Sequence, residues 1–194
     1  MKLAFILLLV SISTIAADEV QKLRTTHGIV SWRETESKKS ADGPGYVIIQ
    51  GVPTDSELQK MEADATQAPA LISEYVPEAL RSKDLLKNLD LALAGWLRST
   101  NAGRESADRV TRIIGAACGQ ECISNLNARW AIVSTDGGTD VALVKDAPNL
   151  SYRPTFVWTF PFSAIRNQID DKKSKIVWDL YASLKEAIEK NEAQ

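Results

Sequence analysis

The sequence predicts an α+β fold, in which about four helices pack on a mainly antiparallel sheet of about five strands. Three observations support this class. Strand-like stretches fall in two blocks with helical stretches between them, one pair of strands has a clear hairpin signal, and several helices carry one apolar stripe. Because strands and helices do not alternate, a parallel α/β sheet is disfavoured. We expect residues 18–194 to form a single globular domain, which is an ordinary size for one core.

The first residues match the pattern of a secretory signal peptide. Lys2 gives a short positive start, residues 3–10 are apolar, and small residues around Ala16 suit cleavage. The apolar run is well short of the ~20 residues that span a bilayer. We therefore expect residues 1–17 to be a cleaved signal peptide. The mature chain would be exported: periplasmic in a Gram-negative host, otherwise secreted, with no membrane segment after cleavage.

The first strand block covers residues 28–34 and 46–50. In the first stretch Val30 and Trp32 share one face and Ile29 lies on the other, which is the alternation of a strand. The second stretch is a short β-branched run. The charged residues 18–24 form a lead-in before the first predicted strand, and we expect the polar residues 35–45 to form a mobile loop or a hairpin connection.

The helical block begins at Thr54, where Thr54 and Glu57 have the spacing of a capping box. Residues 82–98 carry a broad apolar stripe, and Ser82 is a candidate cap. A second amphipathic helix is predicted over residues 105–118, with Gly119 as its end.

The second strand block is centred on Asp136-Gly137-Gly138. These residues separate two β-branched runs, and their glycines suit a tight hairpin turn. Both faces of the runs are apolar, so we expect the hairpin to be central in the sheet. A further strand ends at Pro161, at the sheet margin. A C-terminal helix is predicted from about Ser174.

The chain has two cysteines, Cys118 and Cys122. In an oxidising compartment such close cysteines are expected to pair, so we interpret them as a structural disulfide that fixes a corner after a helix. A redox motif would more typically be C-x-x-C at a helix start, and a metal site needs about four ligands. Reduced or redox-active thiols and a metal site with His27, the one histidine, are the alternatives.

No catalytic, cofactor-binding or metal-binding residue is predicted. The chain lacks a phosphate-binding glycine loop, a nucleophile elbow and a zinc-protease motif. His27 is the only histidine and has no nucleophile motif near it, so a solvated role is expected. Asn149 begins a glycosylation sequon, which has meaning only in a eukaryotic host. The formal charge of −2, with mixed signs along the chain, argues against nucleic acid as a partner.

These features favour an exported binding protein, such as a periplasmic inhibitor or immunity-type protein that neutralises an enzyme or a toxin. The hairpin tip at Asp136, Gly137 and Gly138 is the candidate partner-binding loop, and residues 38–45 are a second one. A secreted hydrolase that uses acidic residues and a small-ligand carrier are the alternatives. The oligomeric state is left open. We expect most of the five tryptophans to lie in the core, with Trp32 and Trp178 the most exposed.

Overall fold

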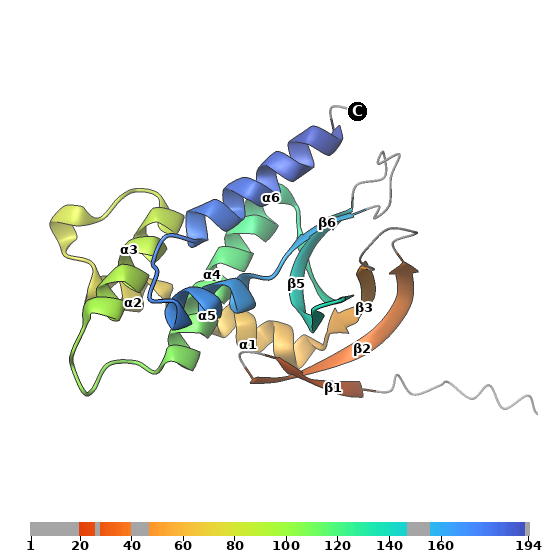
Figure 1. The fold of residues 1–194 in the computed structure, drawn as a ribbon, viewed down its shortest axis with the longest axis horizontal. Coiled ribbons are helices and arrows are strands. Elements are labelled where there is room, and N and C mark those ends of the chain that lie inside the picture. The colour runs from red at the N-terminus through yellow and green to blue at the C-terminus, as the bar shows by residue number, and fades with distance from the viewer. Residues whose placement is uncertain (1–19, 26–27, 40–46, 147–155, 193–194) are drawn as a thin grey trace, which may run out of the picture.

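The computed structural model describes residues 20–25, 28–39, 47–146 and 156–192 (Figure 1). The predicted signal peptide, His27 and Asn149 lie outside these residues. The α+β prediction is confirmed: helices gather on one side of the molecule and an antiparallel sheet occupies the other.

The sheet has six strands within the described residues, one more than expected. Each strand pairs antiparallel with the next one along the chain, so the spatial order is β1-β2-β3-β4-β5-β6. Their bounds are β1 (Val20–Thr25), β2 (Gly28–Lys39), β3 (Val47–Pro53), β4 (Arg129–Thr135), β5 (Gly138–Asp146) and β6 (Phe156–Thr159).

Strands β1 and β2 extend beyond the sequence prediction. No strand is predicted in the charged lead-in, but charged residues are common on an exposed edge strand, and β1 pairs with β2 along its whole length. The predicted alternation in β2 is confirmed, because Val30 is buried and Ile29 is 65% exposed. Trp32, expected to be one of the two most exposed tryptophans, is buried in the core instead. β2 also continues to Lys39, into the segment expected to be a loop.

The predicted central hairpin is confirmed. β4 pairs with β3 on one side and β5 on the other, and β5 in turn pairs with β6. Trp130 and Ile132 of β4 join the core between sheet and helices, while Ala131 and Val133 join a second apolar cluster on the opposite face. Both faces of β4 are therefore buried, as the two-sided apolar pattern predicts.

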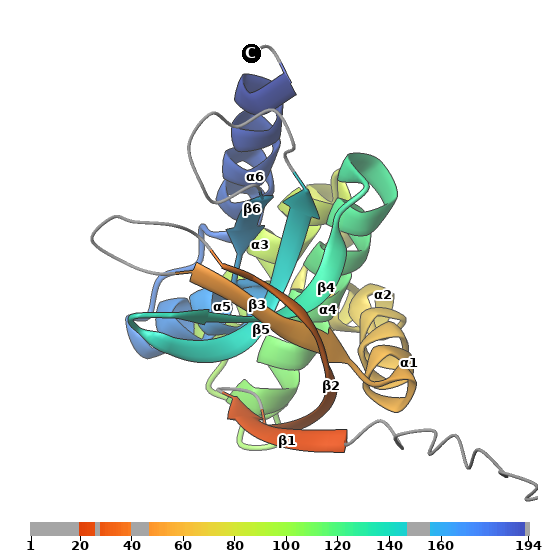
Figure 2. The ribbon, with the colours of Figure 1, turned by 90° about the vertical axis from the view of Figure 1, so that its right-hand side faces the viewer.

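Four helices and one 3₁₀ turn form the connection between β3 and β4, and two more helices follow β6 (Figure 2). The connection contains α1 (Asp55–Ala65), α2 (Ala68–Tyr75), η1 (Glu78–Leu80), α3 (Leu85–Arg98) and α4 (Ala107–Leu126). The chain ends with α5 (Pro161–Asp170) and α6 (Val177–Glu192). Helices α2 and α5 were not predicted.

The helix starts differ in detail from the predictions. Thr54 caps α1 as expected, but its own N–H donates to the Ser31 carbonyl, and the Glu57 carboxylate accepts from Lys60 rather than closing a capping box. Helix α3 is capped by Asp84, whose carboxylate accepts from two backbone N–H groups, and not by Ser82. Each cap still satisfies backbone donors that the helix leaves unpaired.

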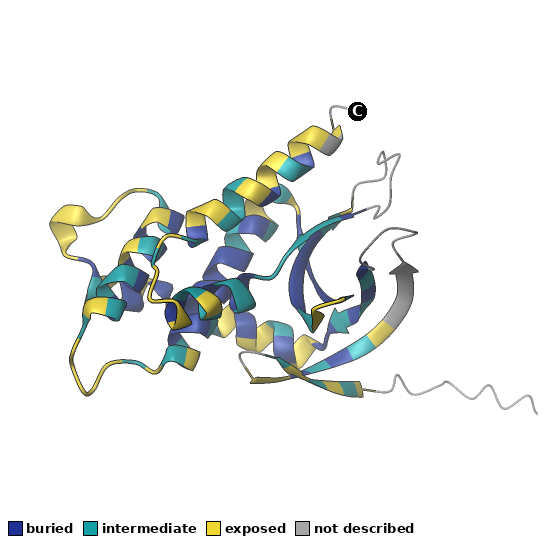
Figure 3. Ribbon diagram, in the orientation of Figure 1, coloured by how far each residue is buried: buried dark blue, intermediate teal, exposed yellow. Residues whose placement is uncertain are grey.

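Helix α4 is the centre of the fold. It contacts β5 and every other α-helix in the described residues, and its middle part is largely buried (Figure 3). The prediction that it ends at Gly119 is wrong, because it continues to Leu126 and is closed by Asn127 in the left-handed conformation. Asn is one of the few residues that enter this conformation readily.

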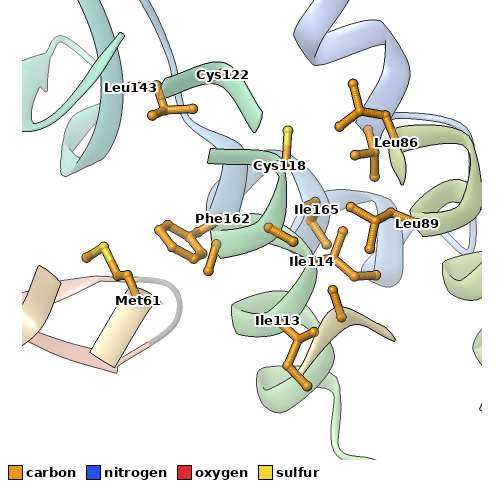
Figure 4. Close-up of a cluster of buried hydrophobic side chains, with 14 of the residues drawn as sticks. Met61, Leu86, Leu89, Ile113, Ile114, Cys118, Cys122, Leu143, Phe162 and Ile165 are labelled. Carbon is orange, nitrogen blue, oxygen red and sulfur yellow. The ribbon is translucent and has the colours of Figure 1, made fainter. Parts of the chain in front are cut away.

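Gly119 serves packing rather than helix termination. The rings of Trp130 (β4) and Phe162 (α5) stack with centroids 5.4 Å apart, and this pair lies against α4. A Cβ on Gly115 would be 2.4 Å from the Phe162 ring, and a Cβ on Gly119 would be 2.1 Å from the Trp130 ring. Figure 4 shows Phe162 beside α4, with Leu86 and Leu89 of α3 on the other side. Only glycine permits this closeness.

Helix α6 is capped by a residue from another helix. The two carboxylate oxygens of Asp90, on α3, accept hydrogen bonds from the backbone N–H groups of Ile176, Val177 and Trp178 at 2.9–3.2 Å. These are N–H groups at the start of α6, where the helix dipole also favours a negative charge. Asp90 therefore both caps α6 and ties it to α3.

Replacing Gly119 by alanine tests the close contact of α4 with the sheet. Alanine is favoured over glycine in a helix by ~0.5–1 kcal/mol, but overpacking a core costs ~1–3 kcal/mol. Because the new methyl group would meet a buried indole at 2.1 Å, we expect Gly119→Ala to lower the free energy of unfolding, measured by urea denaturation. Gly103→Ala is the control, since its Cβ meets nothing closer than 3.6 Å. Equal stability of the two variants would contradict the packing role.

Replacing Asp90 tests the shared cap. Asp90→Ala leaves three N–H groups of α6 without their acceptor, so we expect a loss of ~1–2 kcal/mol in unfolding free energy and faster proteolysis within residues 177–192. Asp90→Asn keeps an acceptor without the charge and should lose less. If both variants match the wild type in urea denaturation and proteolysis, the cap does not anchor α6.

Candidate functional site

The residues predicted to bind a partner form the turn between β4 and β5. Asp136, Gly137 and Gly138 are all exposed, and β4 and β5 pair without interruption up to Thr135 and Gly138. Gly138 has φ of 124°, a conformation that favours glycine. The turn is therefore a short, exposed protrusion on two central strands.

Hydroxyl groups brace the base of this turn. The N–H of Gly137 donates to the Thr135 hydroxyl at 3.2 Å, and that hydroxyl donates to the Gly138 carbonyl at 3.4 Å. One pair further along, the Ser134 and Thr139 hydroxyls lie 2.6 Å apart, and Gln50 of β3 donates to Ser134. These bonds join three strands and hold the turn in one conformation.

A cleft of about 320 Å³ opens beside the turn, and we call it the turn cleft. The turn provides one wall, Arg24 and Thr25 at the end of β1 a second, and Phe160 and Ser163 at the start of α5 a third. The Ser163 hydroxyl donates to the Asp140 carboxylate, which also accepts from the Val141 N–H at 2.7 Å. The start of α5 is thereby tied to β5, close to the turn.

The sequence pattern predicts the turn but not the rest of this cleft. Pro161 is predicted to end a strand, whereas it is the first residue of α5. Proline is favoured at that position, because the first N–H of a helix has no intrahelical acceptor. Phe162, Ile165 and Ile169 follow at helical spacing and are all buried, which was the available signal for the helix.

A second cleft, of about 380 Å³, lies between the start of β2, α1 and α4. Its charged residues are already paired: Lys60 contacts Glu57 at 2.7 Å and Arg112 contacts Asp64 at 3.3 Å. A hydrolase that uses acidic residues would need acids in a cleft wall. Glu57 and Asp64 are such acids, but each has a basic partner. The ion pair of Glu57 therefore lies along α1, and the ion pair of Asp64 joins α1 to α4.

The predicted disulfide between Cys118 and Cys122 is not formed, and both cysteines are free and buried. The expectation placed Cys122 beyond the end of a helix, whereas both residues lie within α4, four positions apart. Residues at this spacing in a helix hold their Cβ atoms ~5–6 Å apart, and a disulfide needs ~3.8 Å. A regular α4 therefore keeps the two sulfurs unbonded.

The environment of the two thiols also disfavours reactivity. A hydrogen bond to Cys122, together with burial, raises the pKa of the Cys118 thiol well above its ordinary value. The thiolate is the nucleophilic form and the form that binds metals. Cys118 and Cys122 fill space in the core between α4 and its neighbours (Figure 4).

Thiol labelling distinguishes buried free cysteines from a disulfide. In the native, unreduced protein we expect neither cysteine to react with a thiol reagent at neutral pH. After denaturation without a reductant both should react, because no bond joins them. Mass spectrometry of the labelled protein counts the adducts. A denatured, unreduced protein that remains unlabelled would show that the disulfide forms after all.

In the part of the chain that the structure describes, no three histidine, cysteine or acidic residues are grouped so as to hold a metal ion, and no helix has the length and hydropathy of a membrane span. His27, the candidate base, is outside this part. Comparisons with protein-family models, curated proteins and solved structures found no match for the chain.

Proposed function

We propose that this chain is an exported binding protein that holds a partner protein, an enzyme or a toxin, at the β4–β5 turn. The observation that carries the proposal is an exposed, braced turn beside an open cleft. An inhibitor or immunity-type protein needs such a protrusion, together with a pocket that receives a side chain of the partner. In a Gram-negative host the periplasm is its place of action.

The rigidity of the turn supports this function. Next to the turn, β4 pairs with β5 on one side and with β3 on the other as far as Thr135, and the hydroxyl groups of Ser134, Thr135 and Thr139 fix the hairpin end. A loop that is already in its bound conformation loses little entropy on binding. Figure 2 shows the hairpin extending to one side of the molecule, near α5.

The turn cleft supports the proposed function because apolar and charged residues both line it. Phe160 offers an apolar surface, and Arg24 offers a cation in the lining of the same cleft. Interfaces concentrate their binding energy where an apolar or aromatic anchor enters such a pocket, with polar groups around its rim. A carrier of apolar ligands would instead use an enclosed apolar cavity.

Site-specific crosslinking tests the proposal. A photoreactive amino acid is placed at Asp136 in the full chain, expressed in its own host, and irradiated. We expect a discrete adduct with a second protein from Asp136 and none from Glu78, an exposed position on η1 that lies away from the turn (Figure 1). Adducts of equal yield from both positions, or none from Asp136, would contradict the proposal.

Charge reversal then tests the contact with the identified partner. Asp136→Arg and Glu78→Arg change the charge equally at exposed positions, so circular dichroism should show the same fold for both. We expect Asp136→Arg to weaken binding by about tenfold or more, as at an interface hot spot, and Glu78→Arg to change it by less than about twofold. Calorimetry measures both affinities. Similar affinities for the two variants would exclude the turn from the interface.

A further inference from the structure

A third cleft lies at the other end of α5 from the turn cleft. It has a volume of about 710 Å³ and is open to solvent between the end of α3, the loop that follows, the start of α4 and the end of α5. We call it the basic cleft and define it by Arg98, Arg104 and Lys172 together with Trp96, Leu97 and Ile169. It shares no residue with the turn cleft.

The charge of this cleft differs from that of the chain. The whole chain has 25 acidic and 23 basic residues, yet the basic cleft is lined by three cations and no carboxylate. The two clefts described above contain both signs: Arg24 and Asp140 both line the turn cleft, and two ion pairs line the cleft beside α1. A site of one sign in an acidic protein attracts ligands of the opposite sign.

The acids around the basic cleft do not neutralise it. Glu105 pairs with Arg109 at 3.0 Å, and Asp171 pairs with Lys173 at 3.2 Å. Asp170 has Arg166 as its partner, at 3.4 Å. By contrast, the exposed side chains of Arg98 and Lys172 form no ion pair with another described residue. Their charge is therefore available to a ligand.

Arg104 is held in place before any ligand arrives. Its Nη1 donates to the carbonyls of Trp96 at 3.0 Å and Ser99 at 2.8 Å, and its guanidinium carbon lies over the Trp96 ring, 4.5 Å from the centroid. Trp96 is itself fixed, since its indole N–H donates to the Glu105 carbonyl at 2.8 Å. Nε and Nη2 of Arg104 have no partner among the described residues. A guanidinium fixed in this way presents a planar pair of donors that suits a carboxylate.

We propose that the basic cleft binds an acidic segment of a protein partner. Arg104 is the fixed hydrogen-bond donor to a carboxylate of that segment, and Arg98 and Lys172 are flanking cations. The apolar side chains of Leu97 and Ile169 suit an aliphatic residue between the acidic ones. An open cleft accommodates an extended segment, whereas small ligands are generally enclosed. This site goes beyond the proposed function, because it stands whether or not the β4–β5 turn binds a partner.

Fluorescence anisotropy tests the site directly. The probe is a short labelled peptide of alternating glutamate and leucine, added to the full chain at low ionic strength. We expect saturable binding that weakens as salt is raised, since exposed charges are screened. A peptide of alternating lysine and leucine should not bind. Absence of saturable binding by the acidic peptide would overturn the proposal.

A double variant and a matched control locate the site. Arg98→Glu with Lys172→Asn removes two flanking cations, and asparagine tolerates the left-handed backbone of Lys172, whose φ is 56°. We expect affinity to fall about tenfold. Lys22→Glu with Lys83→Asn makes the same charge change at exposed residues that do not line the cleft, and should change affinity by less than about twofold. Equal losses in both variants would mean nonspecific attraction and overturn the site.

Competition distinguishes a peptide segment from a small anion. Inorganic phosphate should displace the probe only at concentrations where an equal ionic strength of sodium chloride does so. If phosphate displaces it at far lower concentration, the cleft is a small-anion site and not the docking site of an acidic segment.

Replacing Arg104 by lysine tests its role as a donor. Arg104→Lys keeps the charge but loses the planar pair of donors, so it should still weaken binding of the acidic peptide. Unchanged affinity would remove Arg104 from the proposed role.

Discussion

The contact between α4 and the aromatic pair of Trp130 and Phe162 determines how the rest of the molecule is arranged. Gly115 and Gly119 are one helical turn apart, and together they leave the space that the two stacked rings occupy. One ring comes from the sheet and the other from α5, so this contact joins three parts of the chain around α4. Because α4 also contacts the remaining α-helices, its position fixes theirs.

The same contact positions both proposed binding sites. Phe162 is buried in the first turn of α5, so the start of that helix is held against the core. Ser163 follows at once and connects to Asp140, which places the turn cleft. Ile169, buried near the end of α5, holds the segment that carries Lys172 into the basic cleft. α5 is thus a short rigid link whose two ends serve different surfaces.

Local chemistry decided which parts of the fold could be predicted. The β4–β5 hairpin was predictable because turn glycines and flanking β-branched runs agree. Gly119 was misinterpreted because a glycine after an apolar helical face also marks a helix end, and only its distance to Trp130 shows the packing role. The disulfide prediction was wrong for the same reason, because α4 continues past Gly119 and Cys122 lies within it. The clefts depend on long-range contacts, which no local pattern encodes.

The pairing of β3 with β4 across the helical connection has a kinetic consequence. Gln50 and Ser134 are hydrogen-bonded although 84 residues separate them in the chain. Such non-local contacts form slowly, because the entropy of closing a long loop is lost before the strand pairing adds stabilising contacts. Contacts among α1–α4 are more local, so the helical block can assemble first. Its assembly then shortens the flexible loop that has to close before β4 pairs with β3. Until β4 arrives, β3 is an open strand edge that can pair with another chain. Rapid folding of α1–α4 would thus shorten the time during which the open edge of β3 can aggregate.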